Sequence, residues 1–226
     1  MFQGFTDQTV EFLWGIRFNN ERTWFEAHRQ TYLDEVYRPM RELGDEAYGF
    51  LADRLPDWDL TVKVSRIYRD ARRLHGQGPY KDHLWLSVQR PAGAWEPEPC
   101  FWFELGPETW GYGMGCYLVP PLTMAKLRAR MGADPGPMET LTRRLNRQRE
   151  FVPDGEEYRR AKPGAPSALL EPWYRRKNYS LGHTEALSDE LFSRALVDRI
   201  RKGFAFLQPY YQYFATLEGD PDPRDA

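Results

Sequence analysis

The sequence lacks several features that would place it in a class of protein. Its 226 residues include only 2 cysteines, too few for a disulfide framework, and in a reducing compartment we expect Cys100 and Cys116 to be free thiols. No apolar run approaches the roughly 20 residues that a membrane-spanning helix needs. The first residues show neither the basic nor the apolar part of a secretion signal. These absences predict a soluble, cytoplasmic protein without a membrane partner.

Recognisable motifs for metals, cofactors and nucleophiles are also missing. The 4 histidines show no metal-ligand spacing, and there is no Gly-x-Ser-x-Gly elbow and no P-loop. The alternating Gly111, Gly113 and Gly115 lie inside a strand pattern, so they do not form a dinucleotide fingerprint. We therefore expect no metal and no cofactor.

Lysine is scarce, because 25 of the 31 basic residues are arginine. The net charge of −2 hides an uneven distribution: residues 1–60 hold 6 basic and 12 acidic side chains, whereas residues 61–217 hold 24 basic and 17 acidic ones. Arginine binds carboxylate and phosphate through two parallel hydrogen bonds, although a general bias toward arginine on a solvated surface would give the same composition. An isoelectric point near 6.1 does not favour a nucleic-acid partner.

The apolar pattern predicts an α+β protein. Residues 1–55 show helical spacing, with Thr6 and Asn20 as expected N-caps. From residue 61 the period changes to 2 over four short segments, and 106–109 reads as a hairpin loop, so we expect an antiparallel sheet of about four or more strands. Helical spacing returns after residue 120. The expected arrangement is this sheet flanked by N-terminal and C-terminal helices.

Three further expectations concern the second half of the chain. Residues 152–187 read as irregular, and Pro209 is expected to interrupt the last helix. We expect one domain over residues 1–217, followed by a disordered acidic tail over 218–226. The sequence leaves the oligomeric state open.

The densest group of polar side chains lies between the first two predicted strands, from Lys63 to His83. A loop held by a rigid sheet is a common place for binding groups. We therefore expect a small anionic ligand, bearing phosphate or carboxylate, to be bound here. The candidate ligand-binding residues are Arg66, Arg69, Arg72, Tyr80 and Lys81, with Arg176 from a second basic and aromatic cluster at 173–179. If Arg66 faced the core, Asp70 would be its nearest candidate partner. A purely structural arginine–aspartate network is the alternative.

Several spaced motifs, in order, carry a family resemblance. They are Asn19-Asn20, Trp24-Phe25, Arg66-Ile67-Tyr68-Arg69-Asp70 with Arg72, and Pro79-Tyr80-Lys81, followed by Gly113-x-Gly115 with Tyr117 and Pro120, and by Leu127-Arg128. Over residues 2–130 the chain resembles domain-of-unknown-function family 2461. The resemblance implies an intracellular domain and assigns no reaction, substrate or cofactor.

Two other function classes stay open at this point. An enzyme acting on a phosphorylated small molecule could take acid–base groups from Asp70, His75 and His83, since histidine titrates near neutrality. A module that binds protein or single-stranded nucleic acid could use a basic helix at 138–151 together with the cluster at 173–179. Steep weakening by salt would distinguish the last of these.

Overall fold

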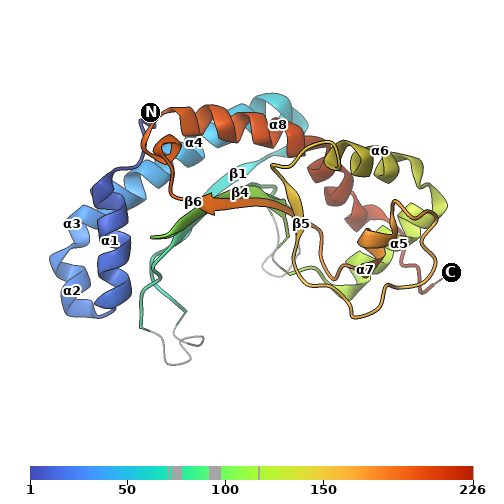
Figure 1. Ribbon diagram of the computed structural model, residues 1–226, viewed down its shortest axis with the longest axis horizontal. Helices are drawn as coiled ribbons and strands as arrows, with labels where there is room; N and C mark the ends of the chain where they lie inside the picture. The colour runs from blue at the N-terminus through green and yellow to red at the C-terminus, as the bar shows by residue number, and fades with distance from the viewer. Residues whose placement is uncertain (71, 73–77, 92–97, 117, 226) are drawn as a thin grey trace. The chain divides into compact units, whose positions relative to one another are not determined.

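The computed structural model describes residues 1–70, 72, 78–91, 98–116 and 118–225 (Figure 1). Its α-helices are α1 (Asp7–Phe18), α2 (Arg22–Ala27), α3 (Arg29–Thr31), α4 (Arg38–Arg54), α5 (Pro121–Ala133), α6 (Gly136–Leu145), α7 (Glu171–Arg175) and α8 (Ala195–Ala215). Its strands are β1 (Thr61–Val64), β2 (Leu84–Gln89), β3 (Cys100–Leu105), β4 (Thr109–Gly115), β5 (Val152–Asp154) and β6 (Ser180–Ala186). A π-helical turn, η1 (Tyr32–Tyr37), joins α3 to α4.

The strands form one six-stranded antiparallel sheet in the order β1-β2-β3-β4-β6-β5. The first four strands are neighbours in chain order, as short links between alternating segments predict. Gly106 and Thr109 close the β3–β4 hairpin, with the amide of Gly106 donating to the carbonyl of Thr109 at 2.9 Å. The α+β class and the antiparallel sheet with helices at both ends are therefore confirmed.

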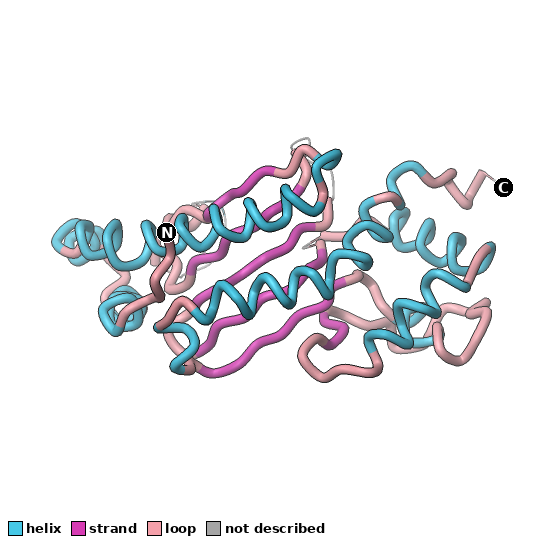
Figure 2. Tube along the Cα trace, turned by 90° about the horizontal axis from the view of Figure 1, so that it is seen from above, coloured by secondary structure: helices cyan, strands magenta, loops and turns pink. Residues whose placement is uncertain are grey.

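Helix α4 covers one face of β1 and β2. An added Cβ on Gly44 would lie 3.1 Å from Val62 and 3.6 Å from Leu86, so the absence of a side chain lets the helix approach the sheet. Figure 2 shows α4 lying across these strands. Val62 is paired with Val88, and Val64 with Leu86, so these four side chains share the helix-covered face. Lys63, paired with Ser87, must then point to the opposite face.

The expected caps of the first two helices have different outcomes. Thr6 caps α1 through a capping box, with reciprocal bonds to Thr9 of 3.0 and 3.3 Å, so this expectation is confirmed. Asn20 does not cap α2, because Glu21 occupies that position without a side-chain bond. The amide of Asn20 bonds elsewhere, as described below. Pro39 lies in the first turn of α4, where a missing amide hydrogen has no cost.

Two expectations for the second half of the chain were wrong. The region 152–187 contains β5, α7 and β6, and β6 was missed because Ser180–Ala186 alternates small and polar residues instead of apolar ones. Pro209 lies inside α8 without ending it. Tyr210, Tyr211 and Phe214 are all buried after it. Their burial outweighs the loss of about 3 kcal/mol that a proline causes in a helix interior.

The chain divides into two compact units. Unit 1 comprises Met1–Pro91, Trp102–Tyr112 and Thr184–Gly203, and unit 2 comprises Ala92–Phe101, Gly113–His183 and Phe204–Ala226. The single domain over 1–217 and the disordered tail stay predictions. Within unit 2, Asp220 pairs with Arg130 at 2.7 Å. None of the described helices is both long enough and apolar enough to cross a membrane.

Candidate functional site

Beyond β1 and before β2 the chain continues their pairing as a hairpin arm, of which the structure describes residues 65–70, 72 and 78–83. The amide of Ser65 donates to the carbonyl of Trp85, that of Arg69 to Pro79 and that of Lys81 to Ile67, at 2.7–2.8 Å. Tyr68 and Tyr80 form an antiparallel bridge between the two sides. Side chains on the arm are therefore held by sheet-like hydrogen bonds. His75, a predicted catalytic residue, lies outside the described residues.

Asn20 and Phe25 fasten the arm to the N-terminal helices. The side-chain amide of Asn20 donates to the carbonyl of Tyr80 and accepts from its backbone amide, both at 2.9 Å. The ring of Tyr80 stacks on Phe25 with centroids 4.4 Å apart. An added Cβ on Gly78 would lie 2.2 Å from the Asn20 amide oxygen, so only glycine fits there. Tyr80, a predicted ligand-binding residue, is 3% exposed, and its ring is part of this anchor.

Arg69 belongs to a network of charged groups at the base of the arm, the arginine network of Arg17, Arg69, Asp82, His83 and Glu108. Arg69 donates through Nε to the carbonyl of Tyr80 at 2.7 Å, and its Nη2 lies 3.8 Å from Asp82. Arg17 donates to Asp82 at 2.6 Å and to Glu108 at 2.7 Å. Each guanidinium of the network therefore already has acceptors within the protein.

Asp82 is the centre of that network. Burial alone would raise the pKa of its carboxyl group, but hydrogen bonds from Arg17 and His83 outweigh burial, and the pKa is lowered. The Nδ1 atom of His83 lies 3.1 Å from Asp82. With His83 34% exposed, this bond orients the imidazole while its other nitrogen is left for a further partner.

Arg72 and Asp70 pair with each other near the tip of the arm. Arg72 donates to the two carboxylate oxygens of Asp70 at 3.0 and 2.7 Å. The side chain of Arg72 is 88% exposed. Arg66 is also exposed, whereas Ser65 and Ile67 on either side are buried. The alternation that would have turned Arg66 to the core therefore breaks at Ser65, and the partner of Asp70 that the structure shows is Arg72.

Lys81 and Lys63 lie over the indole of Trp85, on the sheet face opposite α4. Their Nζ atoms are 5.9 and 5.7 Å from the ring centroid. Lys81 is half-buried, and within the described ranges neither lysine has an ion pair. Burial, with Arg69, Arg66 and Lys63 nearby, lowers the pKa of the Lys81 amine against the opposing effect of Glu104. We call Lys63, Lys81, Arg66 and Trp85 the lysine face.

Arg176 lies in unit 2, in a different setting. Its guanidinium is 3.1 Å from Glu157, and the side chain is 13% exposed. Its predicted role in ligand binding stays a prediction. Among the described residues there is no group of three or more His, Cys, Asp or Glu side chains that could hold a metal ion.

The sequence reasoning missed two members of the lysine face, Lys63 and Trp85, as binding groups. The strand alternation contained the signal: Lys63 alternates with Val62 and Val64, and Trp85 alternates with Leu84 and Leu86. Paired strands place such residues on one face. The pairing of Arg17 with Asp82 had no signal, because 65 positions separate the two residues.

A comparison with family models gives one match. The model described as "Conserved hypothetical protein (DUF2461)" matches residues 8–213, which is nearly the whole chain. The chain belongs to the DUF2461 family. No curated protein matches the chain.

Four of the DUF2461 motifs of the sequence meet at the base of the arm. Asn20 and Phe25, from the first two motifs, both contact Tyr80 of the Pro79-Tyr80-Lys81 motif. Arg69, from the third motif, bonds the carbonyl of the same tyrosine. These contacts hold Lys81 in place next to Trp85. The contacts between the motifs are thus structural, and they position the lysine face.

Proposed function

We propose that the lysine face binds a small anion bearing a phosphate or carboxylate group. The observation that carries this proposal is Lys81: its half-buried ammonium has three other cations near it and forms no ion pair with a carboxylate of the described residues. A buried charge without a partner is unfavourable. An anion placed between Lys81 and Lys63 would remove that penalty.

The indole of Trp85 supports a ligand that also has a ring. It is the surface over which both lysines lie. An aromatic or sugar ring could stack on the indole while its phosphate reaches the two ammonium groups. The proposed ligand class is therefore a ring compound that carries an ionised phosphate or carboxylate group.

The test is a titration with phenyl phosphate, followed through the indole N–H resonance of Trp85 in NMR spectra and assigned with Trp85→Phe. We expect the resonance to shift with phenyl phosphate, and to shift much less with phenol. Lys81→Met should weaken binding about tenfold or more, because a hydrogen bond to a charged group contributes about 1.5–3 kcal/mol. Binding of equal strength in Lys81→Met would contradict the proposal.

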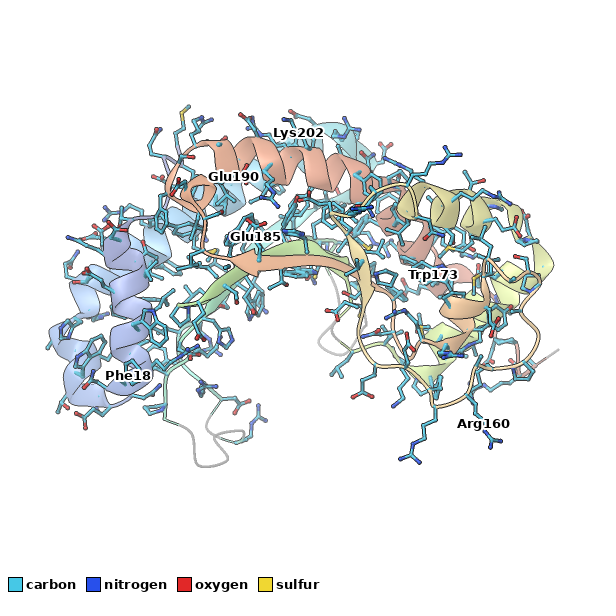
Figure 3. The ribbon with its side chains drawn as sticks, viewed as in Figure 1. Phe18, Arg160, Trp173, Glu185, Glu190 and Lys202 are labelled. Carbon is cyan, nitrogen blue, oxygen red and sulfur yellow. The ribbon has the colours of Figure 1, made fainter. Side chains whose placement is uncertain are left out.

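The matched control is Lys202→Met. Lys202 is an exposed lysine of α8 in the same unit, and Figure 3 shows it on the side of the helix turned away from the sheet. The change removes the same charge and adds the same side chain. Phenyl phosphate should bind Lys202→Met as it binds the unaltered protein. An equal loss in both variants would mean that overall charge alone attracts the anion.

Acid–base catalysis on a phosphorylated compound is the second candidate. The bond between His83 and Asp82 favours it, since a carboxylate that orients an imidazole is a common feature of general bases. The test is release of nitrophenol from p-nitrophenyl phosphate. Turnover that His83→Asn abolishes would support catalysis, and absence of turnover across pH 5–9 would leave binding alone.

A further inference from the structure

A second candidate site lies in unit 2 and shares no residue with the lysine face. It is a groove of about 540 Å³ between α5, the segment 162–164, α7 and residues 223–224. This volume lies within the range of small-molecule sites. Arg128, Ala129 and Gly132 of α5 line this groove, together with Lys162 and Tyr174.

Arg128 is fixed in this groove by neutral acceptors. Its two terminal nitrogens donate to the carbonyls of Met124 and Arg176, at 3.0 and 2.9 Å. Its Nε is buried and has no hydrogen-bond partner. No carboxylate of the described residues forms an ion pair with it. The guanidinium is thus held by two carbonyls, no carboxylate of the described residues neutralises its charge, and each terminal nitrogen keeps a second N–H.

Lys162 is a second cation that lines the groove, and it lies near the same tyrosine ring as Arg128. Its Nζ is 4.7 Å from the ring centroid of Tyr158, and the guanidinium carbon of Arg128 is 5.7 Å from the same centroid. Lys177 is also 5.7 Å from this ring, but Glu156 neutralises it at 2.7 Å. Lys162 forms no ion pair in the part of the chain that the structure describes. Two uncompensated positive charges therefore flank one tyrosine.

The floor of the groove is apolar and open. Ala125, Ala129 and Gly132 of α5 line it together with Pro163 and Pro223, and Arg224, which also lines it, is neutralised by Asp222. A Cβ added to Gly132 would meet only the hydroxyl of Tyr174, at 3.9 Å. Tyr174 is itself fixed, since its hydroxyl donates to the carbonyl of Arg128 at 2.9 Å. A ligand here would meet cations at one end and carbon atoms along its length.

We propose that this groove binds a small organic carboxylate, with its charged group between Arg128 and Lys162 and its aliphatic part along α5. A ligand group with a single negative charge suits two cations, Arg128 and Lys162, that lie next to apolar residues of the groove. The carboxylate would accept from the ammonium of Lys162 and from a terminal N–H of Arg128 that is not bonded to a carbonyl. The proposal does not depend on the lysine face, because the two sites share no residue.

The test uses three probes that separate charge from apolar surface: hexanoate, hexan-1-ol and acetate, followed through the backbone amides of Ala129 and Gly132 by NMR. Hexanoate should shift these amides at a concentration at least about tenfold lower than either other probe. Equal binding of hexanol and hexanoate would overturn the proposal, because the cations would then contribute nothing. An acetate signal as strong as that of hexanoate would show an adventitious ion only and would also overturn it.

Two variants locate the site. Lys162→Gln should weaken hexanoate binding about tenfold, and Ala129→Leu should abolish it by filling the groove with a residue that suits a helix surface. The matched control is Arg160→Gln in the same segment, because Figure 3 shows Arg160 pointing away from the protein. Circular dichroism confirms that each variant folds. Unchanged affinity in the first two variants, or an equal loss in Arg160→Gln, would refute the assignment.

Discussion

The arginine network and the lysine face each include residues of the arm, and they differ in what neutralises their charges. In the network, Arg17 has two carboxylate partners, and Arg69 has a carbonyl and Asp82. On the lysine face, Lys81 has burial and neighbouring cations but no ion pair among the described residues. Both groups include residues of the polar cluster, Lys63 to His83, that the sequence singles out. Of the two groups, the lysine face is the one at which we propose that an external anion binds.

This difference shows that the number of basic residues does not locate an anion site. Arginine pairs readily with carboxylates inside a protein because its planar group makes several hydrogen bonds at once. Other arginines of unit 1 also pair with carboxylates. Arg194 and Arg201 share Glu46, and Arg199 pairs with both Glu185 and Glu190. Lysine is scarce in this sequence, and the two lysines on the sheet face, Lys63 and Lys81, form no ion pair with the described carboxylates. Stability and binding should therefore respond in opposite ways to changes in the two groups.

The largest expected effect comes from breaking the arginine network at its centre. Asp82→Asn removes the charge that Arg17 and Arg69 share and leaves both cations next to a neutral amide. We expect a loss of about 2–3 kcal/mol in the free energy of unfolding, as for hydrogen bonds to charged groups. Urea unfolding followed by tryptophan fluorescence measures it. A stability equal to that of the unaltered protein would mean that the network does not brace the arm.

The pH dependence of stability should follow the same carboxylate. The folded pKa of Asp82 is lower than its unfolded value near 3.8. The unfolded state therefore binds more protons, so the contribution is complete above the unfolded pKa and is lost as the pH falls through the folded pKa. The difference in unfolding free energy between the unaltered protein and Asp82→Asn should shrink when the pH is lowered from 6 to 2. A constant difference would contradict this assignment.

Lys81→Met should have a smaller effect on stability, and of opposite sign. The substitution removes a half-buried charge that has no ion pair and keeps a side chain of similar length, so we expect no loss and a gain of up to about 1 kcal/mol. The gain should fall at high pH. With the folded pKa below 10.5, the unfolded state binds more protons, and the unaltered protein regains stability as the pH rises through that window. A clear destabilisation near pH 7 would mean that Lys81 is a structural residue.

The fold could be predicted from the sequence where the apolar period was long or regular. Thr6 and the stripe behind it predict α1, and the alternation around Val62 and Leu86 predicts β1 and β2. Strand β6 could not be predicted, because a strand that contains Gly182 and few large apolar residues shows no such alternation. Its neighbour β4 approaches it closely, since an added Cβ on Gly115 would lie 2.6 Å from Ser180. That close approach is a tertiary property.

The candidate site could be predicted only as a segment. The density of charge between Lys63 and His83 indicated the arm, but not which side chains have partners. The hydrogen-bond partners are far apart in the sequence: Asn20 bonds Tyr80 across 60 positions, and Arg17 bonds Glu108 across 91. No spacing rule covers such pairs. The division between paired arginines and unpaired lysines is therefore visible only in the folded protein.

Arg72→Ala should have the smallest effect, and it sharpens the comparison because Arg72 was a predicted ligand-binding residue. Its guanidinium is almost fully exposed and pairs with Asp70, its neighbour two positions earlier. Solvent screens an exposed pair of this kind, so its removal should leave the urea midpoint unchanged within error. Binding of phenyl phosphate should also be unchanged if the anion lies between Lys63 and Lys81. Should Arg72→Ala weaken binding as much as Lys81→Met does, the anion site would extend from the sheet face to the tip of the arm, and the distinction between paired and unpaired cations would fail at that residue.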